Sequence, residues 1–307
     1  MIMSKISKSK AKLNQISNSG NILLNILFII VTIICLAPIL LVLSISFSSE
    51  EAIRNAGYSF IPQEFSLKAY DYVLKAGDAI WRAYGVSIVV TLVGTFLSLA
   101  VICMYAYPLS RSSFKAKGFF SFLAYFTMIF GGGLVPWIMV YTRLFKISNS
   151  IWILIFPYLM NAWFVMIMRT FYKTSVPESI IESARIDGAG EFRTFLVIVL
   201  PLSKAGLATI GLFCTLVYWN DWYLPLMFVT ERKFFNIQYL MYQTLVSIQY
   251  LTSGSAQFSE AAVVLANLPT EGARMAIAIL SIGPIVLAYP LFRKYFVKGL
   301  TIGAVKG

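Results

Sequence analysis

Histidine is absent from the 307 residues of this chain, and charged residues make up only 12% of them. The chain therefore lacks the commonest metal ligand in proteins and the side chain that most often acts as a general base near neutral pH. A soluble domain carries roughly 25% charged residues. The composition thus argues against a soluble domain and removes most of the usual groups of enzyme catalysis.

Cysteine is also scarce. The three cysteines, Cys35, Cys103 and Cys214, lie inside apolar runs and form no C-x-x-C pair, so neither a disulfide framework nor a structural zinc site is indicated. The sequence contains no G-x-x-x-x-G-K-[ST] phosphate loop. Any nucleotide hydrolysis linked to this chain is expected on another polypeptide.

Long apolar runs dominate the sequence, of which 59% is hydrophobic. A hydrocarbon core of ~30 Å needs ~20 apolar residues per helix. Six windows meet this length: 22–47, 85–107, 119–141, 151–172, 205–229 and 275–297. The first is too long for a cleaved signal peptide, so it is expected to remain a helix, bent near Pro38. The sequence predicts an all-α integral membrane protein with six transmembrane helices over residues 22–297, preceded by a cytoplasmic segment 1–21 and followed by a cytoplasmic tail 298–307.

The distribution of charge predicts the orientation of the helices. With a cytoplasmic N-terminus, the inner segments 1–20, 109–118, 169–204 and 293–307 hold 16 of the 25 lysine and arginine residues. Cytoplasmic loops of membrane proteins carry such an excess, so both termini are assigned to the cytoplasm. The same topology explains the net charge of +12 better than a nucleic-acid-binding surface does, because that surface needs a basic, solvated face.

Two long outer segments have different expected roles. In the segment 49–84, Ser66 is placed to cap a short helix, which we interpret as an interfacial helix in preference to a ligand contact. The segment 230–274 is polar around Ser253 to Glu260. It is expected to face an extracytoplasmic partner.

The inner segment 177–201 has a distinct pattern. Pro177 suits the first turn of a helix, and Glu178 and Glu182 suit its positive end. Ile180, Ile181 and Ala184 form a small apolar stripe. Gly188 and Gly190 permit the chain to reverse, and a second helix is expected to stop at Pro201. The pattern predicts a rigid cytoplasmic knob that inserts into a groove on a soluble partner.

This segment resembles the EAA motif of ABC importer permeases, E-A-A-x-x-D-G-A-x(8)-I-x-L-P. The positions in register are Glu182, Ala184, Asp187, Gly188, Ala189, Ile198, Leu200 and Pro201, while Ser183 replaces the first alanine. The stretches 219–226 and 269–275 also resemble these permeases, and the ending 298–307 resembles the C-terminus of the smaller permease of maltose-type carbohydrate importers. Within that group, residues 131–136 look most like permeases for complex oligosaccharides of the aldouronate and rhamnogalacturonan type.

The resemblance implies the type I ABC importer permease fold and a subunit that forms half of an oligosaccharide pore in a bacterial cytoplasmic membrane. The implied partners are a second permease, two cytoplasmic ATPases that bind ATP and Mg²⁺, and an extracytoplasmic solute-binding protein. The knob would be the coupling helix, with Glu182 facing a basic residue of the ATPase. The ATPase-coupling residues are then Glu182, Ser183, Ala184, Asp187, Gly188 and Ala189. The tail after Lys298 would also contact the ATPases.

The substrate pathway is less well indicated. Sugar sites combine aromatic platforms with hydrogen-bonding groups, and the fifth span offers Trp219, Asn220, Asp221, Trp222 and Tyr223; an interfacial aromatic belt is the alternative interpretation. Gly131 to Gly133 are expected to distort the third helix, more for close packing than for a bend towards the pore. The alternative function is a secondary transporter for a small polar solute, although Asp221 is its only acidic candidate for an ion relay.

Overall fold

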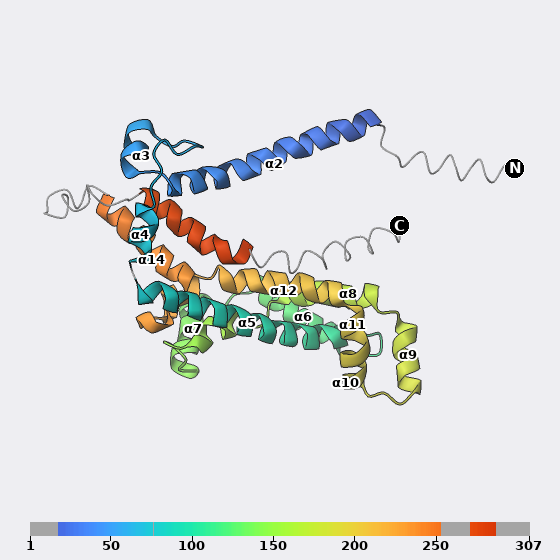
Figure 1. The fold of residues 1–307 in the computed structure, drawn as a ribbon. Helices are drawn as coiled ribbons and strands as arrows, with labels where there is room; N and C mark the ends of the chain where they lie inside the picture. Colours follow the sequence, from blue (N-terminus) through green and yellow to red (C-terminus); the bar gives the residue numbers. More distant parts are fainter. Residues whose placement is uncertain (1–17, 76, 253–270, 287–307) are drawn as a thin grey trace. The chain divides into compact units, whose positions relative to one another are not determined.

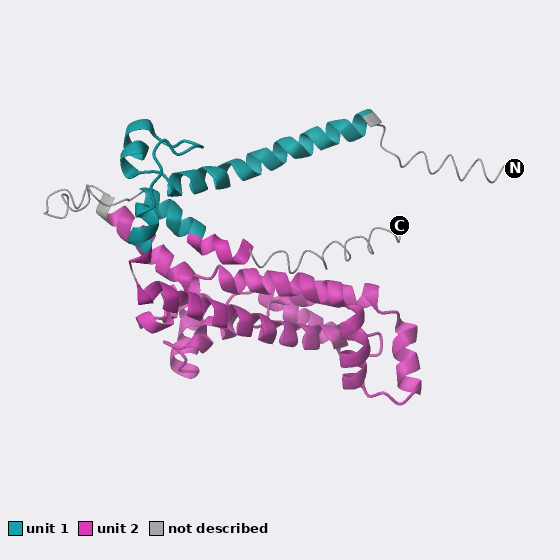
Figure 2. Ribbon diagram, viewed as in Figure 1, with its two compact units in different colours: residues 1–73, 267–279 teal, residues 74–266, 280–307 magenta. Residues whose placement is uncertain are grey.

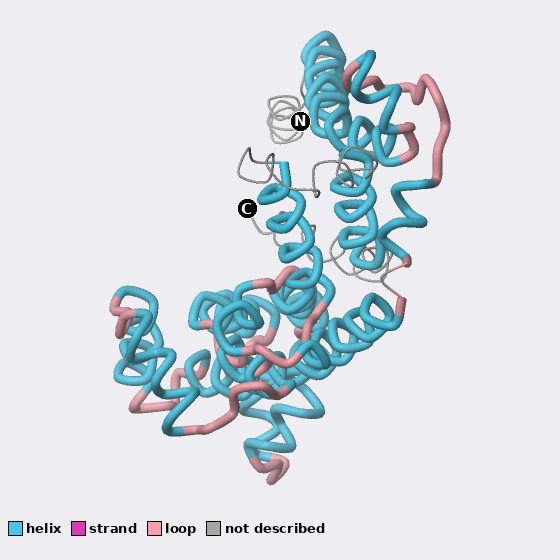
Figure 3. Tube along the Cα trace, turned by 90° about the vertical axis from the view of Figure 1, so that its left-hand side faces the viewer, coloured by secondary structure: helices cyan, strands magenta, loops and turns pink. Residues whose placement is uncertain are grey.

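The computed structural model describes residues 18–75, 77–252 and 271–286. Helices joined by short loops account for this part of the chain, and it contains no named strand, only an isolated bridge between Ser48 and Phe65 (Figure 3). The expectation of an all-α chain is confirmed for these residues. The chain divides into two compact units, residues 1–73 with 267–279 and residues 74–266 with 280–307 (Figure 2).

The first unit begins with a long apolar helix. Its labelled helices are α2 (Asn18–Ser46), α3 (Glu50–Ala56) and α4 (Lys68–Leu74). Pro38 lies inside α2, which continues past it without a break. Most large hydrophobic side chains of α2 are exposed within the first unit. A surface of this kind is typical of a helix that faces lipid or other membrane helices.

Short polar and aromatic contacts hold the rest of this unit together. Ser49 caps α3 by accepting the backbone N–H of Ala52, and Ser66 accepts the backbone N–H of Lys68 at the start of α4. The cap expected at Ser66 is therefore present. The ring of Phe47 stacks on Phe65 at 5.5 Å between centroids. This packing ties the end of α2 to the loop that precedes α4.

The helical residues 271–279 belong to the first unit and contact α3. The carboxylate of Glu50 accepts the backbone N–H groups of Glu271 and Gly272, each at 3.3 Å. A Cβ at Gly272 would lie 3.2 Å from the Cβ of Ala69, so glycine allows the close approach of this segment to α4.

The second unit contains the remaining labelled elements. In chain order they are α5 (Asp78–Ser110), α6 (Lys117–Ile129), α7 (Leu134–Met139), η1 (Val140–Leu144), η2 (Ile151–Leu154), η3 (Phe156–Tyr158), α8 (Ala162–Ser175), α9 (Glu178–Ile186), α10 (Glu191–Thr194), η4 (Phe195–Val199), α11 (Leu200–Leu202), α12 (Lys204–Trp219), α13 (Tyr223–Phe228), η5 (Arg232–Phe234) and α14 (Ile237–Thr252). The central helix is α5, which packs against α8 and α12 (Figure 1).

Two glycines let these central helices approach closely. A Cβ at Gly94 of α5 would lie 2.7 Å from the ring of Tyr218 on α12, and a Cβ at Gly206 of α12 would lie 2.8 Å from the ring of Phe171 on α8. The hydroxyl of Tyr218 donates to the carbonyl of Ile155 at 3.0 Å and contacts Ser98 at 2.8 Å. Small residues at helix crossings are typical of packing between membrane helices.

Each of the six apolar windows contains helical residues, but six separate spans are not confirmed. Among the described residues, α2 and α5 are each long and apolar enough to cross a membrane. Counting three bent pairs of helices as single spans raises the number to five. The bent pairs are Lys117–Ile129 with Leu134–Leu144, Ile151–Tyr158 with Ala162–Ser175, and Glu191–Leu202 with Lys204–Trp219. The sixth window, 275–297, is described only as far as residue 286.

The glycines of the third window break its helix, as the sequence predicts. The axis turns by 113° between Lys117–Ile129 and Leu134–Leu144, and Gly133 has a φ of +86°. Among the described residues of this chain, a Cβ at Gly131 or Gly132 would meet nothing within 4 Å. The expected close packing at these glycines therefore stays a prediction for contacts outside this chain.

Candidate functional site: the α9–α10 segment

The segment from Pro177 to Pro201 lies at the end of unit 2 where α5 ends and α12 begins (Figure 1). Pro177 precedes α9 in an extended conformation, so it is the N-cap and does not belong to the first turn as expected. Glu178 then stands in the first turn and Arg185 in the last turn of α9. This order of charges complements the helix dipole.

The reversal after α9 is a Schellman motif. Gly188 has a φ of +79° and donates its N–H to the carbonyl of Arg185, while Ala189 donates to the carbonyl of Ala184 at 2.9 Å. The left-handed conformation at Gly188 is the one that glycine adopts without steric cost. The reversal that the sequence predicts at this glycine is present.

The six residues predicted to contact the ATPase divide by burial. The side chains of Glu182, Ser183 and Asp187 and the backbone of Gly188 are exposed, whereas Ala184 is buried and Ala189 is half-buried. Of the predicted apolar stripe, Ile181 and Ala184 are buried, but Ile180 is exposed. In the part of the chain that the structure describes, the side chains of Glu182 and Asp187 are therefore open to solvent, whereas Ile181 packs in the hydrophobic core.

The second half of the segment runs through α10, the π-helical turn η4 and α11. Phe195 and Val199 are buried in the core that also holds Ile181, so α9 and η4 share one apolar cluster. Phe192 is 67% exposed. Pro201 does not stop the helix directly, because α11 continues to Leu202 before the chain turns by 84° into α12.

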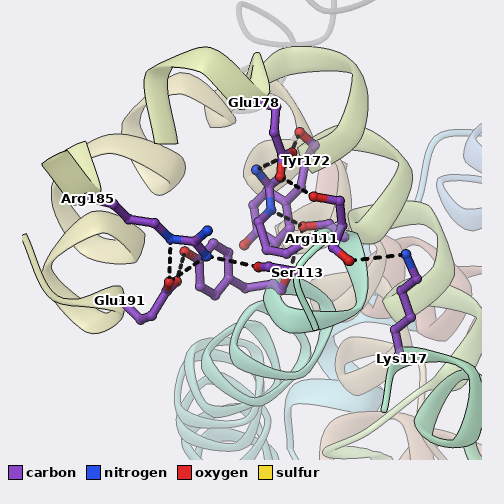
Figure 4. A network of polar contacts seen from close by, with 10 residues as sticks. Arg111, Ser113, Lys117, Tyr172, Glu178, Arg185 and Glu191 are labelled. Carbon is purple, nitrogen blue, oxygen red and sulfur yellow. Dashed lines mark hydrogen bonds and ion pairs between the residues drawn. The ribbon is translucent and has the colours of Figure 1, made fainter. Parts of the chain in front are cut away.

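A first polar cluster connects the two ends of the α9–α10 reversal (Figure 4). Arg185 donates from Nη2 and Nε to Oε1 of Glu191 at 2.7 and 2.9 Å, and also from Nη2 to Ser113 Oγ at 2.9 Å. Tyr107, near the end of α5, donates to Oε2 of Glu191 at 2.7 Å. The hydrogen bond from Tyr107, followed by that from Arg185, holds the pKa of Glu191 below its ordinary value.

A second cluster fixes the start of α9 (Figure 4). Arg111 is only 3% exposed, donates from Nη2 to the carbonyl of Tyr172 at 3.3 Å, and has Nη1 3.7 Å from Oε2 of Glu178. Ser112 donates to Oε1 of Glu178 at 2.6 Å. This hydrogen bond, with a smaller effect from Arg111, lowers the pKa of Glu178. The loop after α5 therefore contacts both ends of α9.

Most of this polar framework was missed by reasoning from the sequence. Arg111 counted there only as one of the basic residues of the inner segment 109–118, and Arg185 and Glu191 were assigned no structural role. A signal for the Arg185–Glu191 pair existed in their opposite charges on either side of the Gly188 reversal. No local signal joined Arg111 to Glu178, because the contact spans 67 residues.

The five residues of the predicted substrate pathway lie in different environments. Trp219 is buried and donates from Nε1 to the carbonyl of Ser281 at 2.9 Å. Asp221 is also buried, and its Oδ1 accepts from the N–H groups of Tyr223 and Leu224 at the start of α13 and from the hydroxyl of Tyr158. These geometries give Trp219 and Asp221 roles in packing and helix capping.

The other members of that group are more accessible. Trp222 is 41% exposed and stacks on Tyr242 at 4.6 Å between centroids. Asn220 is exposed and donates to the carbonyl of Leu216 at 2.9 Å. Tyr223 is half-buried and stacks near Trp137 at 6.3 Å. The polar stretch around Ser253 to Glu260 and the tail 298–307 lie outside the described residues.

Comparison with known proteins places the chain among transport subunits. No family model matches it. It is 33% identical over 90% of its length to the polygalacturonan/rhamnogalacturonan transport system permease protein of Bacillus subtilis, covering 94% of that protein. It is 28% identical to the trehalose/maltose transport system permease of Thermococcus litoralis, with coverage of 93% of this chain and 97% of that one.

A solved structure agrees with these relatives. One chain in the crystal structure of a bacterial ABC transporter that imports the acidic polysaccharide alginate matches with a TM-score of 0.77 and 28% identity, over 92% of this chain and 99% of that chain. The relatives are transport permeases and not enzymes, and they set aside the alternative of a secondary transporter. With its apolar helices, its permease fold and a relative 33% identical over nine-tenths of its length, the chain belongs to the permease subunits of ABC importers for sugars and oligosaccharides.

Proposed function

We propose that this permease forms half of the pathway of an importer for acidic oligosaccharides and that α9 transmits the motion of a cytoplasmic ATPase to it. The observation that carries the coupling role is the geometry of α9. Its carboxylate-bearing face is exposed, while its other face and both of its ends are attached to the rest of unit 2 through Ile181, Arg111 and Arg185.

A helix attached in this way moves as one body with the helices to which it is bound. An ATPase that displaces the exposed face of α9 displaces the ends of α5 and α10 as well, since Arg111 and Glu191 form part of the attachment. Transmission of motion between proteins requires such a packed and connected element. Glu182 and Asp187 are the acidic groups available on the exposed surface for basic residues of the ATPase.

The proposed assembly follows from this role. Two cytoplasmic ATPase subunits hold ATP and Mg²⁺, a second permease completes the pore, and an extracytoplasmic binding protein delivers the sugar. Six spans with both termini in the cytoplasm place the α9–α10 segment on the ATPase side of a bacterial cytoplasmic membrane. The 16 inner lysine and arginine residues against nine outer ones support this orientation.

The substrate class is inferred from two relatives. One is named for transport of polygalacturonan and rhamnogalacturonan, and the other belongs to an importer of the acidic polysaccharide alginate. Uronate-containing oligosaccharides are the chemistry that these two names share. In this proposal the sugar contacts Asn220 and Trp222, whose side chains are exposed, and Tyr242, on which Trp222 stacks.

The coupling role is tested by Glu182→Lys in the complex of both permeases with the ATPases, reconstituted in lipid with the binding protein. Glu51→Lys is the matched control, since it makes the same charge change at an exposed position of α3. The expected result is loss of ATP hydrolysis stimulated by loaded binding protein in Glu182→Lys alone, with assembly of the permease pair intact. Equal stimulation in the two variants contradicts the role of α9.

The substrate class is tested separately, by changing the sugar that is loaded on the binding protein. Oligogalacturonates loaded on the binding protein are compared with neutral maltooligosaccharides of the same length, and ATP hydrolysis by the wild-type complex is measured. Stimulation by the acidic sugars alone is expected. Stimulation by the neutral sugars alone overturns the uronate assignment and leaves the coupling test unaffected.

A further inference from the structure

A basic cavity lies beside the start of α9, at the point where α5, α6 and α8 end or begin. It has a volume of about 360 Å³ and is lined by Ser110, Arg111, Ser112, Lys117, Lys173, Val176, Pro177 and Glu178. The proposed coupling surface does not include it, because Glu182, Ser183 and Asp187 are not among its lining residues.

Positive charge is in excess on the wall of this cavity. Arg111, Lys117 and Lys173 stand against the single carboxylate of Glu178, which leaves two positive charges. Glu178 is already engaged by Ser112 and Arg111. The Nη1 atom of Arg111 is buried and has no hydrogen-bond partner, only the ion pair with Glu178 at 3.7 Å. The guanidinium of Arg111, on the wall of the cavity, therefore keeps one donor that no hydrogen-bond acceptor of the described residues uses.

The two lysines come from different helices and reach the same space. Lys117 is the first residue of α6, and its Nζ lies 3.5 Å from the carbonyl oxygen of Ser112 (Figure 4). Lys173 lies in the last turn of α8. The residue before α6, Ala116, supplies no side-chain cap to the helix. The positive end of α6 thus adds to the charge of Lys117.

We propose that this cavity binds the phosphate of an anionic phospholipid headgroup. The cavity is formed where apolar helices end, which is the depth at which headgroups lie. Directly after Lys117, α6 exposes a row of large apolar side chains, among them Phe119, Phe122 and Tyr125. A lipid whose phosphate contacts Lys117 and Lys173 has this row available for its acyl chains.

A soluble phosphate ester presents the same phosphate chemistry but cannot use the apolar face of α6. Basic pockets between membrane helices bind anionic headgroups, and each lysine or arginine near the surface strengthens the attraction. The bound phosphate contacts α6, α8 and the loop that carries Arg111. Its binding site therefore adjoins Glu178, the first residue of α9.

The test uses the full chain purified with its partner permease in an uncharged detergent. Binding of phosphatidylglycerol is titrated by native mass spectrometry for the wild type, for Lys117→Gln with Lys173→Gln, and for Lys115→Gln with Lys204→Gln. The last pair is the matched control, because both lysines are exposed and neither lines the cavity. Arg111 is kept, since its contacts hold the fold of the loop.

The expected result is a loss of affinity on the order of tenfold for phosphatidylglycerol in the Lys117 and Lys173 double variant, with wild-type affinity in the control. Phosphatidylcholine should bind all three proteins equally weakly. Equal phosphatidylglycerol affinity in the two double variants overturns the site. If inorganic phosphate displaces phosphatidylglycerol from the cavity, the assignment of a lipid ligand is overturned. The site is then assigned to a soluble phosphate compound.

Discussion

Arg111→Met removes the charged group at the centre of the contacts that hold the start of α9. The variant keeps a long apolar side chain but loses the bond from Nε to Ser110 Oγ at 2.9 Å, the bond from Nη2 to the carbonyl of Tyr172 and the ion pair with Glu178. The carbonyl of Tyr172 retains the N–H of Val176. Ser110 Oγ still donates to the carbonyl of Tyr107, so each of the two oxygens that lose Arg111 keeps one hydrogen bond.

The magnitude follows from these three contacts. Hydrogen bonds of a charged group contribute roughly 1.5–3 kcal/mol each, and the lower end applies where the acceptor keeps another partner. The ion pair adds about 0–1 kcal/mol, because 40% of the Glu178 side chain is exposed to solvent. Arg111→Met is thus expected to reduce the free energy of unfolding by about 3–4 kcal/mol.

Two measurements on the purified permease pair check this expectation. The melting temperature is followed by tryptophan fluorescence, and hydrogen exchange is measured on the peptide that contains residues 178–186. Arg193→Met is the matched control, because Arg193 is exposed in the neighbouring α10. The Arg111 variant should melt several degrees lower and exchange faster in α9, whereas the control should match the wild type.

Either of two results refutes this reasoning. Equal melting temperatures for the Arg111 and Arg193 variants show that the buried guanidinium stabilises nothing. A lower melting temperature with unchanged exchange over residues 178–186 places the role of Arg111 between α5 and α8 and not at α9.

Three further predictions rest on single residues. Gly94→Ala should cost about 1–3 kcal/mol of unfolding free energy by overpacking, because the Tyr218 ring that its Cβ would meet is 1% exposed and held by hydrogen bonds. In the control, Gly85→Ala on the same helix, the new Cβ meets nothing within 4 Å and should not destabilise the protein. Thermal melts compare the two variants. Glu191 has a lowered pKa, so its stabilising effect is present above its ordinary value of 4.5 and is lost as the pH falls through the lower folded pKa. Protection factors in α9, which correct for the intrinsic pH dependence of amide exchange, should therefore fall as the pH is lowered below 4.5, and less so in Glu191→Gln. Asp221→Ala should lower the unfolding free energy by about 0.5–2 kcal/mol through loss of the α13 cap. Asp221→Asn should largely retain both stability and transport. If Asp221→Asn keeps its stability but loses transport, capping is not the role of this residue.

The local features of α9 could be predicted because they depend on residues close together in the sequence. Its reversal at Gly188 follows from the conformational freedom of glycine, and its start was predicted to within one residue, at Pro177 in place of Glu178. The apolar stripe was predicted less well, since Ile180 is exposed whereas Ile181 is buried. Periodicity locates a face on a helix, but the neighbours that cover that face come from distant segments such as η4.

The role of Arg111 could not be predicted for a related reason. In a membrane protein, a basic residue in a short loop indicates topology, and its charge suggests exposure to water or headgroups. Here Arg111 is buried because the carbonyl of Tyr172 and the carboxylate of Glu178, both more than 60 residues away, lie within its reach. Only the fold brings these groups together.

The two polar clusters together determine how a force on α9 would be distributed. Arg111 and Ser112 connect the start of α9 to the end of α5 and, through Tyr172, to α8. Arg185 and Glu191 connect the end of α9 to α10 and again to α5, through Tyr107. A helix attached at one end would pivot about that end when an ATPase displaced it. Attachment at both ends resists such rotation, so displacement of the exposed face should translate the ends of α5 and α8 together, which is the motion that opening and closing a pore between rigid helices requires.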